Sequence, residues 1–327
     1  MRTIAIEEHF LASGFKEVLA HNATGQGAGP SPTMMAGIQD KLSDLGATRL
    51  KDMDAAGIDL QVISHTAMSD MAISNEQEVS LAQEANNQLA AAIARYPERF
   101  AGFATLPMRT PAAAADELER TVRKLGFKAA MINGTTQGRF LDDPIFLPIL
   151  ERATALEVPI YIHPAEPPAE VRKAYYSGFE PAIAFPLATA GWGWHSEVGI
   201  HSLRLILAGV FDRFPNLQII IGHMGEMIPF MLDRINNVLT PAARHLKRPI
   251  PEYFLQNFTI TTSGFFTDPP LLLALQTLGA DRIIFSVDYP YSSNEQGREF
   301  LNHAAISPAD KEKISHLNAE RILRLRQ

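Results

Sequence analysis

Five side chains of the kinds that bind metal ions and transfer protons stand at or just beyond the ends of short apolar segments. Glu7 and His9 follow the first of these segments, His163 the fifth, His223 the sixth and Asp288 the eighth. Any one of them alone is more readily explained as a cap or a surface group, because polar side chains are mostly exposed. Their repeated placement at the carboxyl ends of predicted strands indicates that all five face one rim, where they can form an active site.

The predicted metal site consists of Glu7, His9, His163 and Asp288. The two-residue period of an extended strand places Glu7 and His9 on one face, while Glu8 points away. The first and eighth strands are neighbours in a closed barrel, so Asp288 comes beside this pair and His163 approaches from across the mouth. Two imidazoles and two carboxylates suit zinc, manganese or iron, and magnesium less well. The predicted cofactor is one divalent ion, with zinc or manganese favoured and magnesium as an option.

The segment IIIGHMGEMIPF places His223 just after a buried strand and Glu226 three residues later, at the predicted start of a helix. At that spacing the carboxylate can hold the imidazole in one tautomer and raise its basicity. The alternative is that Glu226 only caps the helix, where the helix dipole favours a negative charge. Because this strand ends on the same rim, we interpret His223 and Glu226 as an acid–base pair.

Short β-branched segments alternate with longer segments of helical periodicity along the whole chain. The predicted strands are 3–6, 59–64, 100–105, 128–132, 159–162, 217–222, 258–262 and 282–287. The predicted helices include 75–95, 111–124, 144–156, 196–211, 226–238 and 268–278. This alternation predicts an α/β protein with a (β/α)8 TIM-barrel fold. The alternative, a doubly wound open sheet, typically has fewer strands and often a glycine-rich turn after the first strand, where this chain has EEHF.

Two long segments interrupt the alternation, at 22–40 after the first strand and at 164–195 after the fifth. Both lie on the carboxyl side of strands, so they are predicted to extend the rim that carries the active site or to contact another subunit. No internal repeat, low-complexity tract or linker divides the chain. We therefore expect residues 1–327 to form a single domain.

Four further residues are predicted to bind the substrate. His65 and Asn133 end the second and fourth predicted strands, and Trp194 and Tyr289 lie on rim loops where they can enclose a ring. The alternatives are that the first two are ordinary loop residues, and that the aromatic pair packs on a helix or on a second subunit.

The composition narrows the classes of function. The formal net charge is −7, without long acidic or basic blocks, which gives no attraction for nucleic acid or an anionic membrane. The first residues lack the apolar core of a secretion signal, and no segment reaches the roughly 18 uncharged apolar residues of a membrane span. The chain has no cysteine, so nitrogen and oxygen must hold any metal. We expect a cytoplasmic protein whose partner is a small molecule.

Several longer motifs run from one end of the chain to the other. They are AIEEHF at 5–10, RLKDMDAAGID at 49–59, LGFKAAMING at 125–134, VPIYIHP at 158–164, HSLRLILAGVFDRFPNLQIIIGHMGE at 201–226, ITTSG at 260–264 and GADRIIFSVDYPY at 279–291. Through these motifs the chain resembles the branch of the amidohydrolase superfamily that contains aminocarboxymuconate-semialdehyde decarboxylase and the metal-dependent aromatic decarboxylases. It is similar in particular to γ-resorcylate and 2,3-dihydroxybenzoate decarboxylases.

The resemblance implies a role for each matching residue. It implies the same four metal ligands and the His223–Glu226 pair, and it makes Asp288 the group that delivers a proton to the ring carbon before carbon dioxide leaves. It further implies that the substrate is a hydroxylated aromatic acid bound through its carboxylate and ortho hydroxyl, and that the chain forms homodimers or homotetramers. No redox cofactor is needed.

Three departures from the family concern the substrate pocket. The loop TTQGRFLDD at 135–143 is shorter than the tyrosine-bearing arm of dihydroxybenzoate decarboxylases, His65 stands where asparagine is usual, and SGFF at 263–266 replaces SGNF. The leading hypothesis is therefore a decarboxylase whose exact substrate is open. A hydrolase of an ester, lactone or amide would use the same residues on a metal-activated water. A barrel without catalytic activity is the third hypothesis, although such a protein should have lost ligands and none is missing.

Overall fold

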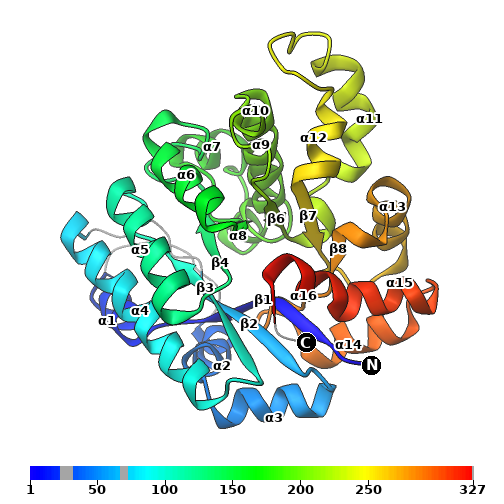
Figure 1. Cartoon of the computed structure of the whole chain (residues 1–327). Coiled ribbons are helices and arrows are strands. Elements are labelled where there is room, and N and C mark those ends of the chain that lie inside the picture. The colour runs from blue at the N-terminus through cyan, green and yellow to red at the C-terminus, as the bar shows by residue number, and fades with distance from the viewer. Residues whose placement is uncertain (23–31, 67–72, 326–327) are drawn as a thin grey trace.

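The structure, a computed structural model, is a barrel of eight parallel strands with helices around it (Figure 1). It describes residues 1–22, 32–66 and 73–325. Each strand pairs with the next in sequence order. The strands are β1 (Ile4–Phe10), β2 (Leu60–His65), β3 (Phe100–Thr105), β4 (Ala129–Asn133), β5 (Ile160–His163), β6 (Ile219–Ile221), β7 (Phe258–Thr261) and β8 (Ile283–Ile284). The predicted (β/α)8 TIM barrel is confirmed.

The helices lie outside the strands. They are α1 (Ser13–Asn22), α2 (Pro32–Ser43), α3 (Ala47–Ala56), α4 (Asn75–Arg95), α5 (Pro111–Leu125), α6 (Leu147–Leu156), α7 (Ala169–Tyr175), α8 (Pro181–Ala188), α9 (Gly193–Leu207), α10 (Val210–Arg213), α11 (Ile228–Leu239), α12 (Ile250–Asn257), α13 (Asp268–Leu278), α14 (Asn294–His303), α15 (Pro308–Glu312) and α16 (Asn318–Leu323). Local signals explain the bounds of several. For example, the Ser74 side chain and Gln77 form a capping box that begins α4.

Most predicted helices and strands are present at the expected positions, but some of their predicted bounds are wrong. Helices 75–95 and 268–278 are right, whereas the helix predicted at 196–211 is two helices, α9 and α10, separated by Gly209 with φ 72°. The segment 164–195 is helical over α7 and α8 and contains the start of α9. Residues 23–31 of the predicted loop 22–40 lie outside the described part of the chain, residue 22 ends α1, and residues 32–40 belong to α2.

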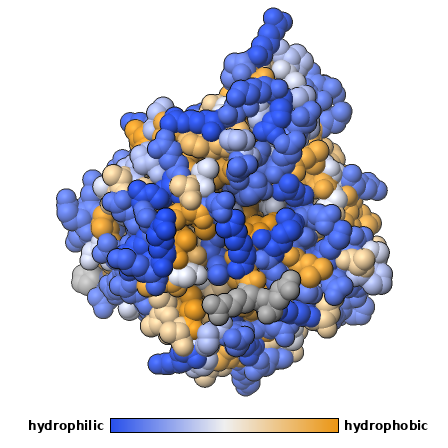
Figure 2. All heavy atoms as spheres, in the orientation of Figure 1, coloured by the Kyte–Doolittle hydropathy of each residue, from blue (hydrophilic) through white to orange (hydrophobic). Residues whose placement is uncertain are grey.

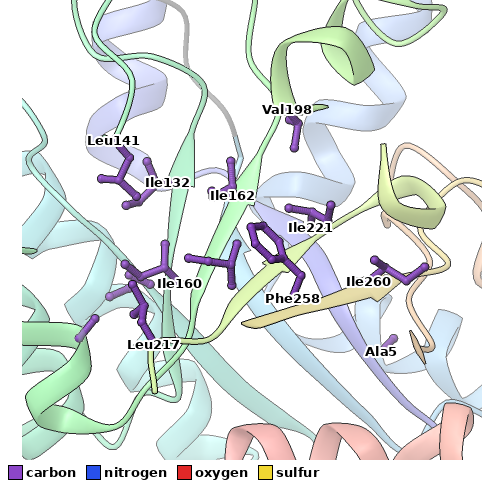
Figure 3. Packing of buried hydrophobic residues seen from close by; sticks show 14 of the residues in the cluster. Ala5, Ile132, Leu141, Ile160, Ile162, Val198, Leu217, Ile221, Phe258 and Ile260 are labelled. Carbon is purple, nitrogen blue, oxygen red and sulfur yellow. The ribbon is translucent and has the colours of Figure 1, made fainter. Parts of the chain in front are cut away.

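Apolar side chains form two layers on the two faces of the sheet. The inner layer fills the barrel with residues such as Ile6, Phe103 and Ile220. The outer layer lies between strands and helices, and it includes Ile160, Ile162, Leu217, Ile221 and Phe258 (Figure 3). Successive residues of a strand alternate between the two layers, as a pleated strand requires. Burial on both faces explains why the strands read as nearly continuous apolar segments.

A β-bulge in β1 determines which face of the sheet carries the side chains of Glu7 and His9. Ala5 packs in the outer layer and Ile6 in the inner layer, so strict alternation would send Glu7 and His9 outward. The ladder between β1 and β2 shifts between Ala5 and Glu8. One extra residue reverses the faces of the residues that follow it. Glu7 and His9 therefore point into the barrel, and the strand that was predicted to end at residue 6 continues through both of them.

The described residues form no regular β-ladder between β8 and β1. Hydrogen bonds from side chains and a backbone hydrogen bond join the two segments instead. The hydroxyl oxygen of Ser286 accepts hydrogen bonds from the N–H groups of Ile6, at 3.2 Å, and Glu7, at 2.6 Å. The His9 N–H donates to the carbonyl oxygen of Tyr289 at 2.7 Å. These bonds bring the chain after β8 against the end of β1, as the metal site requires.

Polar residues cover most of the face seen in Figure 2, and apolar residues are exposed there in small groups. The N-terminal segment lies near the C-terminal helices, because Arg2 Nη1 is 3.0 Å from Glu320 Oε1 (Figure 1). Within the described residues, no helix combines the length and the apolar character needed to cross a membrane.

Candidate active site

The structure brings Glu7, His9, His163 and Asp288 together at the carboxyl ends of β1, β5 and β8. One nitrogen or oxygen from each side chain lies within 4.8 Å of those of the other three. Asp288 Oδ1 is 3.1 Å from His9 Nε2, and Glu7 Oε1 is 3.5 Å from His163 Nε2. We call these four residues the metal cluster. Residues separated by up to 281 positions in the sequence (288 − 7) thus share one site.

Three hydroxyl groups hold Glu7 by one of its two oxygens. Glu7 Oε2 accepts hydrogen bonds from the hydroxyls of Tyr161, Thr261 and Ser263. Glu7 Oε1 is buried and has no hydrogen-bond partner in the part of the chain that the structure describes. Tyr161, Thr261 and Ser263 were not identified as site residues from the sequence, although the last two belong to the ITTSG motif. The carboxylate is thereby oriented with one oxygen toward the two imidazoles.

The imidazole of His163 presents an unprotonated nitrogen to the other members of the metal cluster. His163 Nδ1 lies 2.7 Å from the carbonyl oxygen of Pro164 and must donate to it, so Nε2 is left with a lone pair. Burial lowers the pKa of His163 to about 3, which keeps the ring neutral. His9 Nε2 is buried and its alignment to Asp288 is not that of a hydrogen bond. A backbone carbonyl that fixes the tautomer of a histidine is the usual support of a metal ligand.

These features fit a divalent cation. Two buried polar atoms of the metal cluster, Glu7 Oε1 and His9 Nε2, lack hydrogen-bond partners within the described residues, and unpaired buried polar atoms are rare in folded proteins. Burial raises the pKa of Glu7, because a carboxylate removed from water is disfavoured without a compensating charge. Nitrogen and oxygen donors of this kind suit zinc or manganese.

Glu8 supports the segment that carries Asp288. Asp288 adopts a left-handed backbone conformation with φ 73°, and the carboxylate of Glu8 accepts the N–H groups on either side, from Val287 at 3.0 Å and Tyr289 at 2.9 Å. Burial raises the pKa of Glu8 to about 8, against the effect of these two N–H donors. Glu8 thus replaces part of the missing ladder between β8 and β1, a role that the sequence did not reveal.

His223 and Glu226 are hydrogen-bonded to each other through His223 Nδ1 and Glu226 Oε1, at 2.7 Å. The backbone between them is a turn in which each residue from 223 to 227 has positive φ, and α11 begins only at Ile228. The idea that Glu226 caps the helix is therefore wrong, because its carboxylate is directed to imidazoles. His223 Nε2 faces the metal cluster, 3.9 Å from both Glu7 Oε1 and Asp288 Oδ2.

Charge interactions shift the pKa values of this group in opposite directions. Burial lowers the pKa of His223, but the charges of Glu226 and Glu7 outweigh burial and hold it well above its usual range. Burial raises the pKa of Asp288, but its contacts with His223 and His9 outweigh that effect and hold it below the usual range. A proton shared between the two residues is therefore favoured on His223.

His195 also belongs to this site and was not identified from the sequence. Its Nδ1 is 2.6 Å from Glu226 Oε2, the second oxygen of the carboxylate. The available signal was weak: His195 is the last residue of the long rim segment 164–195. His195, His223 and Glu226 also have donor atoms within 4.8 Å of one another, but hydrogen bonds to Glu226 already occupy the Nδ1 atoms of both imidazoles.

His65 and Asn133 line one cavity of about 120 Å³ at the carboxyl ends of β2, β3 and β4. His65 Nε2 and Asn133 Oδ1 are buried there and have no hydrogen-bond partner among residues 1–22, 32–66 and 73–325. The hydroxyls of Thr66, also on the cavity wall, and Tyr291 are 2.6 Å apart, and the ring of Tyr291 packs edge-on against His9 at 5.6 Å. Tyr291 thus connects the wall of the cavity to His9 of the metal cluster.

The other two residues predicted to bind substrate are placed differently. Tyr289 is 2% exposed, its hydroxyl donates to Asp52 at 2.8 Å, and its ring lies 4.8 Å from the guanidinium of Arg49. Its side chain therefore serves the packing of α3 on the barrel, and Tyr291 takes the place beside the site. Trp194 is half-buried in α9, and its buried indole Nε1 has no hydrogen-bond partner among the described residues.

Comparison with known proteins agrees with this geometry. The family model described as amidohydrolase matches residues 19–325. The γ-resorcylate decarboxylase of Rhizobium sp. (strain MTP-10005) is 38% identical over 334 residues, which cover 98% of each chain. The structure of 5-carboxyvanillate decarboxylase LigW from Sphingomonas paucimobilis has a TM-score of 0.91 and 33% identity over 99% of both chains.

The dihydroxybenzoic acid decarboxylase from Polaromonas sp. JS666, solved with bound manganese and the inhibitor 2-nitroresorcinol, has a TM-score of 0.88 at 33% identity. The match covers 100% of this chain and 98% of that one. The resemblance predicted from the motifs is confirmed. This chain belongs to the amidohydrolase family.

Proposed function

We propose that this protein is a metal-dependent, non-oxidative decarboxylase, a carboxy-lyase that acts on a hydroxylated aromatic acid such as a dihydroxybenzoate. The observation that carries the proposal is the metal cluster with the His223–Glu226 pair directed at it. The relatives are in keeping with it, since they are decarboxylases of aromatic acids and one was solved with manganese and a resorcinol inhibitor.

The reaction replaces a carboxylate by hydrogen. A proton is added to the ring carbon, the bond to the carboxylate breaks, its electron pair stays with the ring, and carbon dioxide leaves. A divalent ion in the metal cluster would lower the pKa of a coordinated hydroxyl and orient the ring. Asp288 delivers the proton to the ring carbon. At rest this proton is favoured on His223, whose Nε2 is 3.9 Å from Asp288 Oδ2, so His223 supplies it to Asp288 in each turnover and regains a proton from solvent.

We propose that the ring extends from the metal cluster into the cavity lined by His65 and Asn133. His65 Nδ1 donates to the carbonyl oxygen of Thr66 at 2.9 Å, and burial lowers the pKa of His65 to about 4, so Nε2 stays an acceptor at neutral pH. A hydroxyl on the ring would satisfy this acceptor. Two unpaired acceptors on one cavity wall favour a substrate that carries a donor there.

The His65→Phe variant tests this placement. Phenylalanine keeps the size of the ring but removes the acceptor, and one buried hydrogen bond contributes about 1 kcal/mol, or roughly a fivefold change in affinity. We expect KM for a dihydroxybenzoate to rise about fivefold or more, with KM for 2-hydroxybenzoate unchanged. Equal changes for both acids would contradict the placement.

One preparation can distinguish the decarboxylase from the hydrolase. Protein loaded with manganese or zinc is incubated with a panel of ortho-hydroxybenzoates and, separately, with aryl esters and lactones. We expect carbon dioxide release and a change in ring absorbance from at least one acid. Ester cleavage without carbon dioxide from any acid would assign the hydrolase. Absence of both activities, with no divalent ion found by elemental analysis, would favour a binding protein.

We further propose that the chain is a single domain, located in the cytoplasm and assembled as a homodimer or homotetramer. Support for assembly comes from large apolar side chains exposed outside the barrel, such as Phe230 at 76% and Ile183 at 55%. Light scattering is expected to give two or four times the mass of one 36.0 kDa chain. A mass equal to one chain would contradict the assembly.

A further inference from the structure

His195 completes a chain of imidazole, carboxylate and imidazole at the edge of the site. Glu226 Oε2 is 2.6 Å from His195 Nδ1, and Glu226 Oε1 is 2.7 Å from His223 Nδ1. The Glu226 side chain is 0% exposed, so these two imidazoles provide the hydrogen bonds recorded for its oxygens. The carboxylate is thus held from both sides.

The directions of these hydrogen bonds follow from the groups involved. His195 Nε2 is 3.0 Å from the carbonyl oxygen of Ala190, which can only accept, so Nε2 donates. Burial raises the pKa of Glu226, but the charge of His223 and the hydrogen bonds from His195 and His223 outweigh burial and lower it to about 2. Glu226 is therefore a carboxylate and accepts from both imidazoles. Both recorded partners of the His195 ring, Glu226 and the carbonyl oxygen of Ala190, are therefore hydrogen-bond acceptors.

The backbone and the neighbouring rings restrict the position of the His195 imidazole. His195 is in the first turn of α9, which begins at Gly193. A Cβ at Gly193 would overlap the carbonyl oxygen of Ala188, so the backbone is closely packed there. The ring packs edge-on against His223, with centroids 4.9 Å apart, and against Phe265 at 5.5 Å. Its side chain is 12% exposed. The short connection from α8 to α9 thus presents His195 to Glu226.

We propose that His195 is a positioning residue for the acid–base pair. His195 donates a hydrogen bond to Glu226 Oε2 and so fixes the orientation of the carboxylate. Glu226 Oε1 then accepts from His223 Nδ1 and keeps a proton there. This contact also directs His223 Nε2 toward the metal cluster. The inference rests on the proposed acid–base role of His223. Without His195, one oxygen of a buried carboxylate would lose its donor, and Glu226 would turn or take up a proton. His223 would then lose the acceptor that keeps a proton on its Nδ1.

Two substitutions separate the two hydrogen bonds of His195. In His195→Asn the side-chain amide lies near the former Nδ1 and can still donate to Glu226. In His195→Gln the amide lies near the former Nε2 and can still donate to Ala190, but the donor to Glu226 is lost. Partners of this kind typically contribute about tenfold to a hundredfold to activity. We expect kcat to fall about tenfold in His195→Gln with KM within twofold, and His195→Asn to stay within twofold of wild type.

The second measurement does not depend on turnover. Long-range ¹H–¹⁵N spectra of the zinc-loaded full chain report which nitrogen of His223 carries a proton, with His223→Gln to assign the signal. We expect Nδ1–H in wild type and His195→Asn, and a population with unprotonated Nδ1 in His195→Gln. Thermal unfolding shows whether each variant is folded.

The outcomes separate the two proposals. Unchanged kcat and an unchanged His223 signal in His195→Gln would overturn the positioning role, and so would equal losses in both variants, which would indicate a general packing effect. If wild type releases no carbon dioxide from any acid, the proposed function fails. The His223 spectra still decide whether His195 holds the pair.

Discussion

The Asp288→Asn variant is expected to lose about 10²–10⁴-fold in kcat, the usual contribution of a positioned proton donor. Asparagine keeps the shape of the side chain and one oxygen for the metal cluster, but it has no acid proton to deliver to the ring carbon. The position is fixed by the left-handed turn and by Glu8, so the amide should occupy the same place. The measurement is carbon dioxide release at saturating substrate and saturating manganese.

The matched control is Asp281→Asn, the same change on the surface. The Asp281 side chain is 68% exposed, pairs with Lys313 and precedes β8, at the amino end of the strand and away from the site, and an exposed pair contributes little to stability. We expect its kcat to equal that of wild type. Turnover of Asp288→Asn within tenfold of wild type would remove Asp288 from its assigned role, under the decarboxylase and the hydrolase mechanisms alike.

Glu7→Gln is expected to abolish metal binding at concentrations that saturate wild type. Three hydroxyls donate to Glu7 Oε2, so the amide oxygen of glutamine should take that position. Its NH₂ group would then replace Oε1 and point protons at the cation. For wild type, an ion at 100 times its Kd stabilises the fold by about 2.7 kcal/mol, which should raise the Tm of a chain of 327 residues by roughly 4 °C. We expect no such rise in Glu7→Gln.

Metal binding is measured by elemental analysis after gel filtration. The effect on stability is measured by thermal unfolding with and without manganese. Glu98→Gln, a change of the same kind at an exposed position, should retain the metal and the rise in Tm. Bound manganese in Glu7→Gln at the wild-type ratio would exclude Glu7 as an essential ligand. Binding of manganese to neither wild type nor variant would remove the metal site itself.

The sequence predicted the position of the site more reliably than its internal contacts. The eight apolar segments imply the barrel, and in a barrel of parallel strands every carboxyl end is at one rim. That argument brings His163 and Asp288 toward β1 without knowledge of any contact. It could not separate Tyr289 from Tyr291, because both follow the short strand β8 and only the packing of Arg49 and Asp52 draws Tyr289 away from the site.

The same limit applies to the segment after β6. The spacing of His223 and Glu226 suggested the first turn of a helix, but five consecutive residues adopt positive φ there and four of them are not glycine. Such conformations cost free energy and persist only where surrounding contacts outweigh the cost. The hydrogen bonds of Glu226 to two imidazoles are contacts of that kind, and one partner, His195, is 31 positions away in the sequence.

By itself the sequence determined the barrel, the family and the rim on which the chemistry-bearing residues meet, because period, segment length and motif are local properties. Tertiary structure decided which way those residues face. The faces of β1 follow from its register against β2, and a single extra residue between Ala5 and Glu8 turns Glu7 and His9 into the barrel. Register depends on pairing between distant segments, so no local pattern in β1 reveals it.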